Sequence, residues 1–239
     1  MSTRGGDAGR WRGMVLSGPA LWVMVAVVGV MSGVVAVSVY RTLTVSPAER
    51  VVRIDTTACG HSSATSGVGV VVGSDLVLTA AHTVSGAGEV VVATAVGSKE
   101  SRGTVVAYDQ RSDLALVAVV GIPGDGVDIA ETSAGDEVKL LGTGPGVVTA
   151  TVTKRAEVRI EGVRSSERGS RFGFLLDVEV ALGDSGAPVF DLDDRLVGIV
   201  FGRSESGTFA VRAEEIEAIL AAPETEWVCE ASAHELVQR

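Results

Sequence analysis

Short apolar runs, never long ones, fill most of this sequence after residue 57. Twelve runs of four to nine residues, rich in Val and separated by Gly, Ser and Asp, follow one another up to residue 211. β-Branched runs of this length, bounded by turn residues, predict strands. In chain order they are 68–72, 76–79, 89–95, 103–107, 114–120, 137–142, 147–153, 157–161, 172–180, 187–191, 196–201 and 208–211. The body of the chain is therefore expected to be all-β, a barrel or a sandwich.

A division of this body is expected near residues 121–134 (GIPGDGVDIAETSA), which carry several turn residues. It would separate two groups of six strands, one over about 58–122 and the other over about 133–211. Gly73-Ser74-Asp75 predicts a hairpin turn between two apolar strands. The one helical pattern lies at 212–221 (RAEEIEAILA), where apolar residues share one face and a proline follows.

A long uncharged segment precedes the β-rich body. Residues 13–40 contain no charged side chain. About 20 apolar residues cross a bilayer as a helix, so a transmembrane helix over 14–40 is predicted. Three arginines precede it against one aspartate, which predicts a cytoplasmic N-terminus and an extracytoplasmic body. A cleaved signal peptide is the alternative, because Ala36-Val37-Ser38 has a small-x-small pattern; signal peptides, however, have apolar regions of only about 7–15 residues.

The charge and the cysteine content exclude several classes of protein. The net charge of −10 argues against nucleic-acid binding, which needs clustered Lys and Arg. Two cysteines are too few for a disulfide-dense miniprotein or a four-cysteine zinc site, and three scattered histidines make another zinc site improbable. No metal is therefore expected. Cys59 and Cys229 bracket the β region and are expected to form a disulfide outside the membrane, with two buried free thiols as the alternative.

Three segments carry the parts of a nucleophilic serine system, in the order His, Asp, Ser. TAAH ends with His82, SDLAL contains Asp113 and GDSGAP contains Ser185. A serine hydroxyl needs an adjacent base, which an imidazole supplies and a carboxylate orients. The amides of Gly183 and Ser185 could form an oxyanion hole, because Gly183 can adopt backbone angles closed to other residues. Each residue alone is common in loops, but the three motifs together in an all-β chain predict this chemistry.

These three segments resemble the active-site segments of the chymotrypsin/trypsin-like serine proteases, over roughly residues 59–222. The segment 198–202 (GIVFG) is similar to the substrate-pairing strand of that family. The resemblance implies two six-stranded antiparallel β-barrels with the catalytic groups between them. It implies His82 as general base, Asp113 as its orienting acid and Ser185 as nucleophile. The predicted membrane helix, the cysteine pair and the preference for Arg over Lys add a further resemblance, to the anchored extracytoplasmic serine proteases of actinobacteria.

The sequence departs from the family pattern in two places. Ala187 stands where a second glycine usually follows the serine, and no new N-terminus is evident that would pair with Asp184, so Asp184 needs another partner. Glu179 lies six residues before Ser185, where the family places the floor of the primary pocket. A carboxylate there would attract a basic side chain; the alternative is an outward-facing strand residue.

The sequence therefore predicts five parts: a cytoplasmic N-terminus (1–13), the membrane helix (14–40), a linker (41–57), a trypsin-like protease domain (58–230) and a tail (231–239). The predicted activity is that of a membrane-anchored extracytoplasmic serine endopeptidase, which acts on proteins or peptides through an acyl-enzyme without a metal or organic cofactor. One alternative is a catalytically silent, protease-like binding module displayed outside the membrane. Another is an esterase that uses the same three residues.

Overall fold

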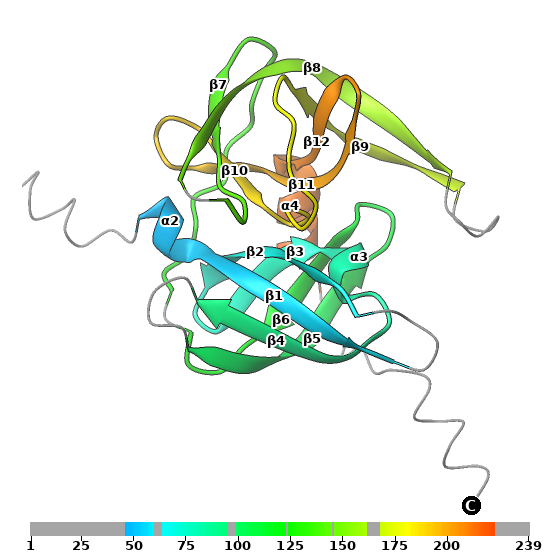
Figure 1. Ribbon diagram of the computed structural model, residues 1–239. Coiled ribbons are helices and arrows are strands. Elements are labelled where there is room, and N and C mark those ends of the chain that lie inside the picture. The colour runs from blue at the N-terminus through cyan, green and yellow to red at the C-terminus, as the bar shows by residue number, and fades with distance from the viewer. Residues whose placement is uncertain are drawn as a thin grey trace, which may run out of the picture. The chain divides into compact units, whose positions relative to one another are not determined.

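A computed structural model describes residues 46–59, 64–94, 99–122, 124–144, 146–161 and 168–222. These residues form two closed six-stranded antiparallel barrels and a C-terminal helix, and Figure 1 shows one barrel above the other. The predicted membrane helix, Cys229 and the tail lie outside the described residues. Among the residues that the structure describes, no helix is long and apolar enough to cross a membrane.

The first barrel is built from the N-terminal half of the described chain. Its strands are β1 (Val51–Ala58), β2 (Ser66–Gly73), β3 (Leu76–Ala80), β4 (Ala87–Thr94), β5 (Glu100–Asp109) and β6 (Leu114–Ala118). They close in the order β1-β2-β3-β6-β5-β4. Two short helices accompany them, α2 (Pro47–Arg50) directly before β1 and α3 (Ala81–Val84) directly after β3.

The second barrel repeats this arrangement with the C-terminal half. Its strands are β7 (Glu137–Leu140), β8 (Val148–Glu161), β9 (Arg168–Leu176), β10 (Pro188–Phe190), β11 (Leu196–Ser204) and β12 (Gly207–Arg212). They close in the order β10-β11-β12-β9-β8-β7. The prediction of two six-stranded antiparallel barrels is confirmed.

The interiors of the barrels follow from the alternation of side chains along the strands. In β1 the inward positions Val52, Ile54 and Thr56 are buried, while Arg53 faces solvent. A strand with one buried face produces this period of two. β2 instead buries six consecutive residues, because one face lines the barrel and the other is covered by the second barrel. The barrels therefore pack on each other through their strands.

Two differences from the predicted strands concern the boundaries. Five predicted runs lie before residues 121–134 and seven after, and β1 is the missing sixth strand of the first barrel. It occupies part of the predicted linker, where the polar outward residues of VVRIDTTA obscure the strand. The runs 147–153 and 157–161 form a single strand, β8, because the polar residues between them continue to pair with β9 across a bulge after Val152.

The predicted C-terminal helix is present as α4 (Ala213–Leu220), one residue shorter at each end. It buries Ala213, Ile216 and Ile219. Its contacts reach β5 and β6 of the first barrel and β11 and β12 of the second. The apolar face predicted from the sequence thus holds the two barrels together.

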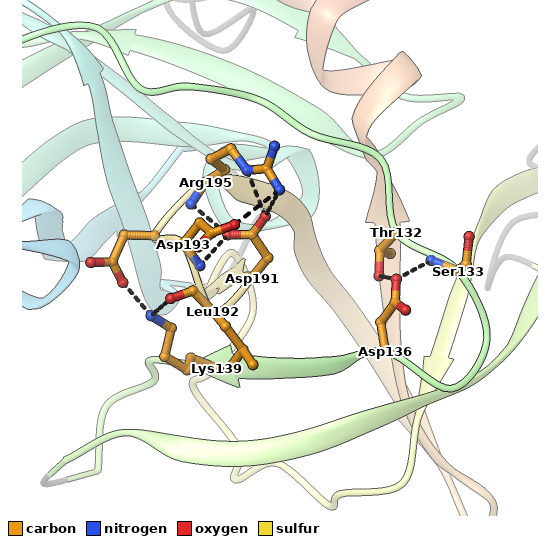
Figure 2. A network of polar contacts seen from close by, with 9 residues as sticks. Thr132, Ser133, Asp136, Lys139, Asp191, Leu192, Asp193 and Arg195 are labelled. Carbon is orange, nitrogen blue, oxygen red and sulfur yellow. Dashed lines mark hydrogen bonds and ion pairs between the residues drawn. The ribbon is translucent and has the colours of Figure 1, made fainter.

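Polar side chains order turns of the second barrel (Figure 2). Asp191 accepts hydrogen bonds from the amides of Asp193 and Arg195 and from the Arg195 guanidinium. Lys139 on β7 pairs with Asp194 in the same turn. Aspartate bonded to an amide two residues ahead stabilises a tight turn, so this network fixes the β10–β11 hairpin.

Candidate active site

His82 and Asp113 are joined directly. The Nδ1 atom of His82 lies 2.7 Å from Oδ2 of Asp113, and the backbone amide of His82 donates to Oδ1 at 2.9 Å. The side chain of Asp113 is only 2% exposed, whereas that of His82 is 45% exposed. The carboxylate therefore fixes the Nδ1 side of the ring and leaves the other ring nitrogen available toward solvent.

The local backbone explains how these two residues meet. β3 ends at Ala80, which pairs with Leu114 at the start of β6, so the residues just beyond both strand ends become neighbours. The amide of Ala81 donates to the carbonyl of Asp113 at 2.8 Å, which links the two segments a second time. Asp113 adopts a positive φ of 62°. Asp tolerates this left-handed conformation better than most residues.

The loop that carries Ser185 packs against the same strand ends. The Ser185 carbonyl accepts the amide of Val68 on β2 at 2.8 Å. A Cβ atom added to Gly186 would lie 2.0 Å from the Val68 carbonyl oxygen, 2.5 Å from the hydroxyl of Thr79 and 3.0 Å from the amide of Ala80. Gly186 is thus pressed against the end of β3, two residues before His82. This contact between the barrels brings the serine segment to the His82 segment.

Gly67 shows the same proximity from the β2 side. Its added Cβ would lie 2.7 Å from the side chain of Thr83 and 2.8 Å from the Ser185 carbonyl oxygen. Thr83 directly follows His82 in α3, so the backbone of the serine loop and a side chain next to His82 share one glycine neighbour. Within the described residues, the Ser185 hydroxyl forms no hydrogen bond with the His82 ring. Catalytic hydrogen bonds are commonly long in substrate-free enzymes and tighten with substrate.

Two backbone amides in the serine loop are available to a ligand. Gly183 adopts a φ of +98°, the left-handed conformation that favours glycine. Neither its amide nor that of Ser185 donates to another described residue, whereas the neighbouring amides of Asp184 and Gly186 donate to the carbonyls of Ala181 and Val200. Two free amides separated by a single residue are what an anion-binding pocket requires.

Asp184 has a partner on the far side of this loop. Its Oδ1 accepts the amide and the hydroxyl of Thr143, both at 2.7 Å, and its Oδ2 accepts the amide of Ala181 at 2.9 Å. Asp184 is buried, and Gly142 leaves space for its carboxylate. Thr143 is therefore the partner that Asp184 was expected to need. No motif in the sequence identifies Thr143 in this role.

Glu179 lies on the solvent side of the loop. Its side chain is 78% exposed and pairs with Arg203 at 3.5 Å. The same guanidinium donates to the carbonyl of Val180. An outward-facing side chain is what the second interpretation of the sequence expects, although Glu179 lies in the loop after β9, which ends at Leu176, and not in a strand. At the start of the loop, hydrogen bonds from the backbone and side chain of Thr151 hold the pKa of Asp177 below its ordinary value.

Arg171 is a further charged residue at this site, and the sequence analysis missed it. It lies on β9, and its Nη1 is 3.2 Å from Oδ2 of Asp113. Its guanidinium stacks over the ring of Phe201, 5.4 Å from the centroid, and its side chain is only 16% exposed. An arginine in the polar stretch RGSR carries no sequence signal of this role, because the contact joins the two barrels.

Of the two cysteines of the predicted disulfide, Cys229 lies outside the described residues. Cys59, at the end of β1, is half-buried.

Known proteins resemble this chain in sequence. Residues 67–199 match the family model described as a trypsin-like peptidase domain. The serine protease Rv3671c of Mycobacterium tuberculosis (strain H37Rv) is 35% identical over 182 residues, which cover 72% of this chain but only 45% of that relative. The chain therefore spans less than half the length of this curated relative.

Solved structures share the same architecture. The crystal structure of Rv3671c protease in its active form superposes with a TM-score of 0.65 at 27% identity, covering 77% of this chain and 86% of that one. The HtrA-type protease AlgW with a tripeptide superposes with a TM-score of 0.59 at 19% identity, covering 72% of this chain and 59% of that one. At that lower identity the likeness concerns the fold alone.

Proposed function

Because this chain belongs to the trypsin-like peptidase family, we propose that it is a serine endopeptidase whose catalytic residues are His82, Asp113 and Ser185. The observation that carries the proposal is the 2.7 Å contact between His82 and the buried Asp113, at the point where the Ser185 loop packs on β3. An imidazole held by a buried carboxylate beside a serine is arranged as a general base.

The reaction proceeds in two acyl-transfer steps. The Ser185 oxygen attacks the carbonyl carbon of the peptide bond while His82 accepts its proton, and Asp113 stabilises the imidazolium. The amides of Gly183 and Ser185 donate to the oxyanion of the tetrahedral intermediate. The C–N bond then breaks as His82 returns the proton to the leaving amine. Water, deprotonated by His82, attacks the acyl-enzyme, which releases the second product and regenerates the Ser185 hydroxyl.

The loop geometry supports the role of these amides. The carboxylate of Asp184 receives three hydrogen bonds from Thr143 and Ala181, and these contacts hold the segment between Ala181 and Ser185 in place. A donor pair held in place before the substrate arrives needs no reorganisation when charge develops. Each such donor is worth about 10²–10³ in rate.

The proposal extends to location. Residues 14–40 would anchor the enzyme in the membrane as a single helix, with the N-terminus cytoplasmic and the protease domain outside. Cys59 and Cys229 would form a disulfide in that oxidising environment, closing a loop of about 170 residues worth roughly 4–5 kcal/mol of stability. The substrates would be proteins or peptides outside the membrane, within reach of the segment that follows the helix.

The test of the proposed activity is casein hydrolysis by the wild type and by Ser185→Ala. Ser206→Ala is the matched control, because Ser206 is an exposed turn residue between β11 and β12. We expect hydrolysis by the wild type and the control and loss of at least 10³-fold in Ser185→Ala. Equal rates in all three would refute the mechanism. A folded but inactive wild type would favour the silent binding module, and cleavage of esters but no amides would favour the esterase.

A further inference from the structure

We propose that Arg171 is a positioning residue for the catalytic base: it supplies the counter-charge of Asp113, so that His82 can remain neutral beside a buried carboxylate. The inference rests on the proposed function and deepens it. It follows from the 3.2 Å contact between the Arg171 guanidinium and Oδ2 of Asp113, the same oxygen that holds Nδ1 of His82. Two cationic or potentially cationic groups thus compete for one carboxylate oxygen.

Burial makes this competition matter. The side chain of Asp113 is 2% exposed and cannot draw compensation from water. A buried charge needs a partner, and removing that partner is strongly destabilising. Without Arg171, the ion-pair partner that remains to Asp113 among the described residues is the His82 ring, which would neutralise the carboxylate by taking up a proton. A protonated imidazole cannot accept the proton of Ser185, so the enzyme would lose its base near neutral pH.

The position of Arg171 is fixed by its surroundings. It lies on β9, paired with Val158 of β8, and its guanidinium stacks on the ring of Phe201 on β11. Arg combines a permanent charge with a planar face that stacks on aromatic rings. Because Arg171 and Phe201 belong to the second barrel and Asp113 and His82 to the first, the ion pair also locks the barrels together at the site.

Other charged groups near α3 are already engaged elsewhere. The elements that pack against α3 are β1, β3, β5 and β6, together with β2 where Gly67 meets Thr83, and β2, β3 and β6 carry no charged residue. The titratable or charged residues on the other two strands are Arg53, Asp55, Glu100, Arg102, Tyr108 and Asp109.

The aspartates among them, and the turn before β6, have partners of their own. Asp55 pairs with Arg53 and accepts the hydroxyl of Ser66, while Asp109 accepts the hydroxyl of Ser112 and the amide of Arg111. Within the described residues, the ion pairs of Asp113 are with His82 and Arg171 alone. Among these aspartates, Asp113 is therefore the one whose charge Arg171 balances.

The test is the pH profile of kcat/KM for a peptide substrate, measured on the full chain with Arg171→Met, Arg171→Lys and the control Arg155→Met. Arg155 is an arginine of the same β8–β9 pair whose partners are Glu131 and Glu214, away from the site. We expect Arg171→Met to move the acidic limb of the kcat/KM profile to higher pH by about 1 pH unit, which is the effect of one nearby charge. The loss would be about tenfold at pH 6 and less than about twofold at pH 9. Arg171→Lys, which keeps the charge, and Arg155→Met should retain the wild-type limb.

A second arm identifies the carboxylate as the route of the effect. The rate of Ser185 labelling by a fluorophosphonate, followed by mass spectrometry, is compared in Asp113→Asn with and without Arg171→Met. In the Asp113→Asn background, adding Arg171→Met should not move the acidic limb of the pH profile of the labelling rate, because the carboxylate charge that Arg171 balances is already absent. An unmoved limb in Arg171→Met alone, or an equal shift in the Asp113→Asn background, would overturn the proposal.

Two further comparisons keep the result decisive. If Arg171→Met does not fold, Arg171→Gln carries the same test, with the same shift expected and an unchanged limb refuting the role. If Ser185→Ala hydrolyses peptides as the wild type does, the proposed function itself fails. If Ser185→Ala is inactive while the Arg171→Met profile coincides with that of the wild type, only the role of Arg171 fails.

Discussion

Substitution of Gly186 by alanine tests how the serine loop reaches the histidine segment. Gly186 has a φ of +86°, and the new Cβ would lie 2.0 Å from the carbonyl oxygen of Val68 and 2.5 Å from the Thr79 hydroxyl. The left-handed conformation alone costs roughly 1–2 kcal/mol for a residue with a Cβ. Overpacking against a rigid backbone adds about 1–3 kcal/mol, and breaking a buried hydrogen bond at the contact adds about 1–3 kcal/mol.

Gly186→Ala should therefore lower the free energy of unfolding by about 3–8 kcal/mol, and it should slow fluorophosphonate labelling of the folded protein by at least about 10²-fold, because the serine loop must move away from β3. Gly135→Ala is the matched control, since Gly135 has a φ of +96° and nothing within 4 Å of its added Cβ. It should cost only the conformational term of about 1–2 kcal/mol and leave labelling unchanged.

Denaturant unfolding and labelling rates measure the two effects separately. If Gly186→Ala behaves like Gly135→Ala in both measurements, Gly186 does not hold the serine loop against β3. The geometric basis for placing Ser185 beside His82 would then be lost.

Three further predictions concern the surroundings of the site. Thr143→Val removes the hydroxyl that donates to the buried Asp184 and should lower the free energy of unfolding by about 1–3 kcal/mol in denaturant titration; an unchanged value would show that the Thr143 amide suffices. Glu179→Gln should leave the preference among basic and neutral residues in a peptide-library profile unchanged, because Glu179 is exposed and paired with Arg203; lost preference for Arg and Lys would restore the pocket interpretation. Cys59→Ser should cost about 2–5 kcal/mol under oxidising conditions, and an intact mass of the wild type that gains no hydrogens on reduction would exclude the disulfide.

Much of the fold could be predicted because the strands obey local rules. The apolar run Leu76–Ala80 and the turn at Asp75 are readable without any tertiary contact, and so is the apolar face of α4. β1 could not be separated from the linker, because its outward positions are polar and its length is defined only by pairing with β2 and β4. Boundaries of this kind depend on partners distant in the chain.

The residues of the candidate site also fall into two groups, those that the sequence predicts and those that only the structure reveals. His82, Asp113 and Ser185 are visible because each lies in a short motif with a chemical reason for its residue types. Arg171 and Thr143 have no such motif, since their roles arise from contacts with Asp113 and Asp184, which are distant in the chain. Contacts between distant segments leave no local pattern, so supporting residues need the structure to be found.

The most direct measurement of the central claim is the site of fluorophosphonate modification, read by peptide mass spectrometry on the wild type and on His82→Ala. The proposal predicts a single adduct on Ser185 in the wild type and labelling slowed by about 10³-fold or more when the imidazole is removed. An adduct on another residue, or labelling of Ser185 at the same rate without His82, would contradict it.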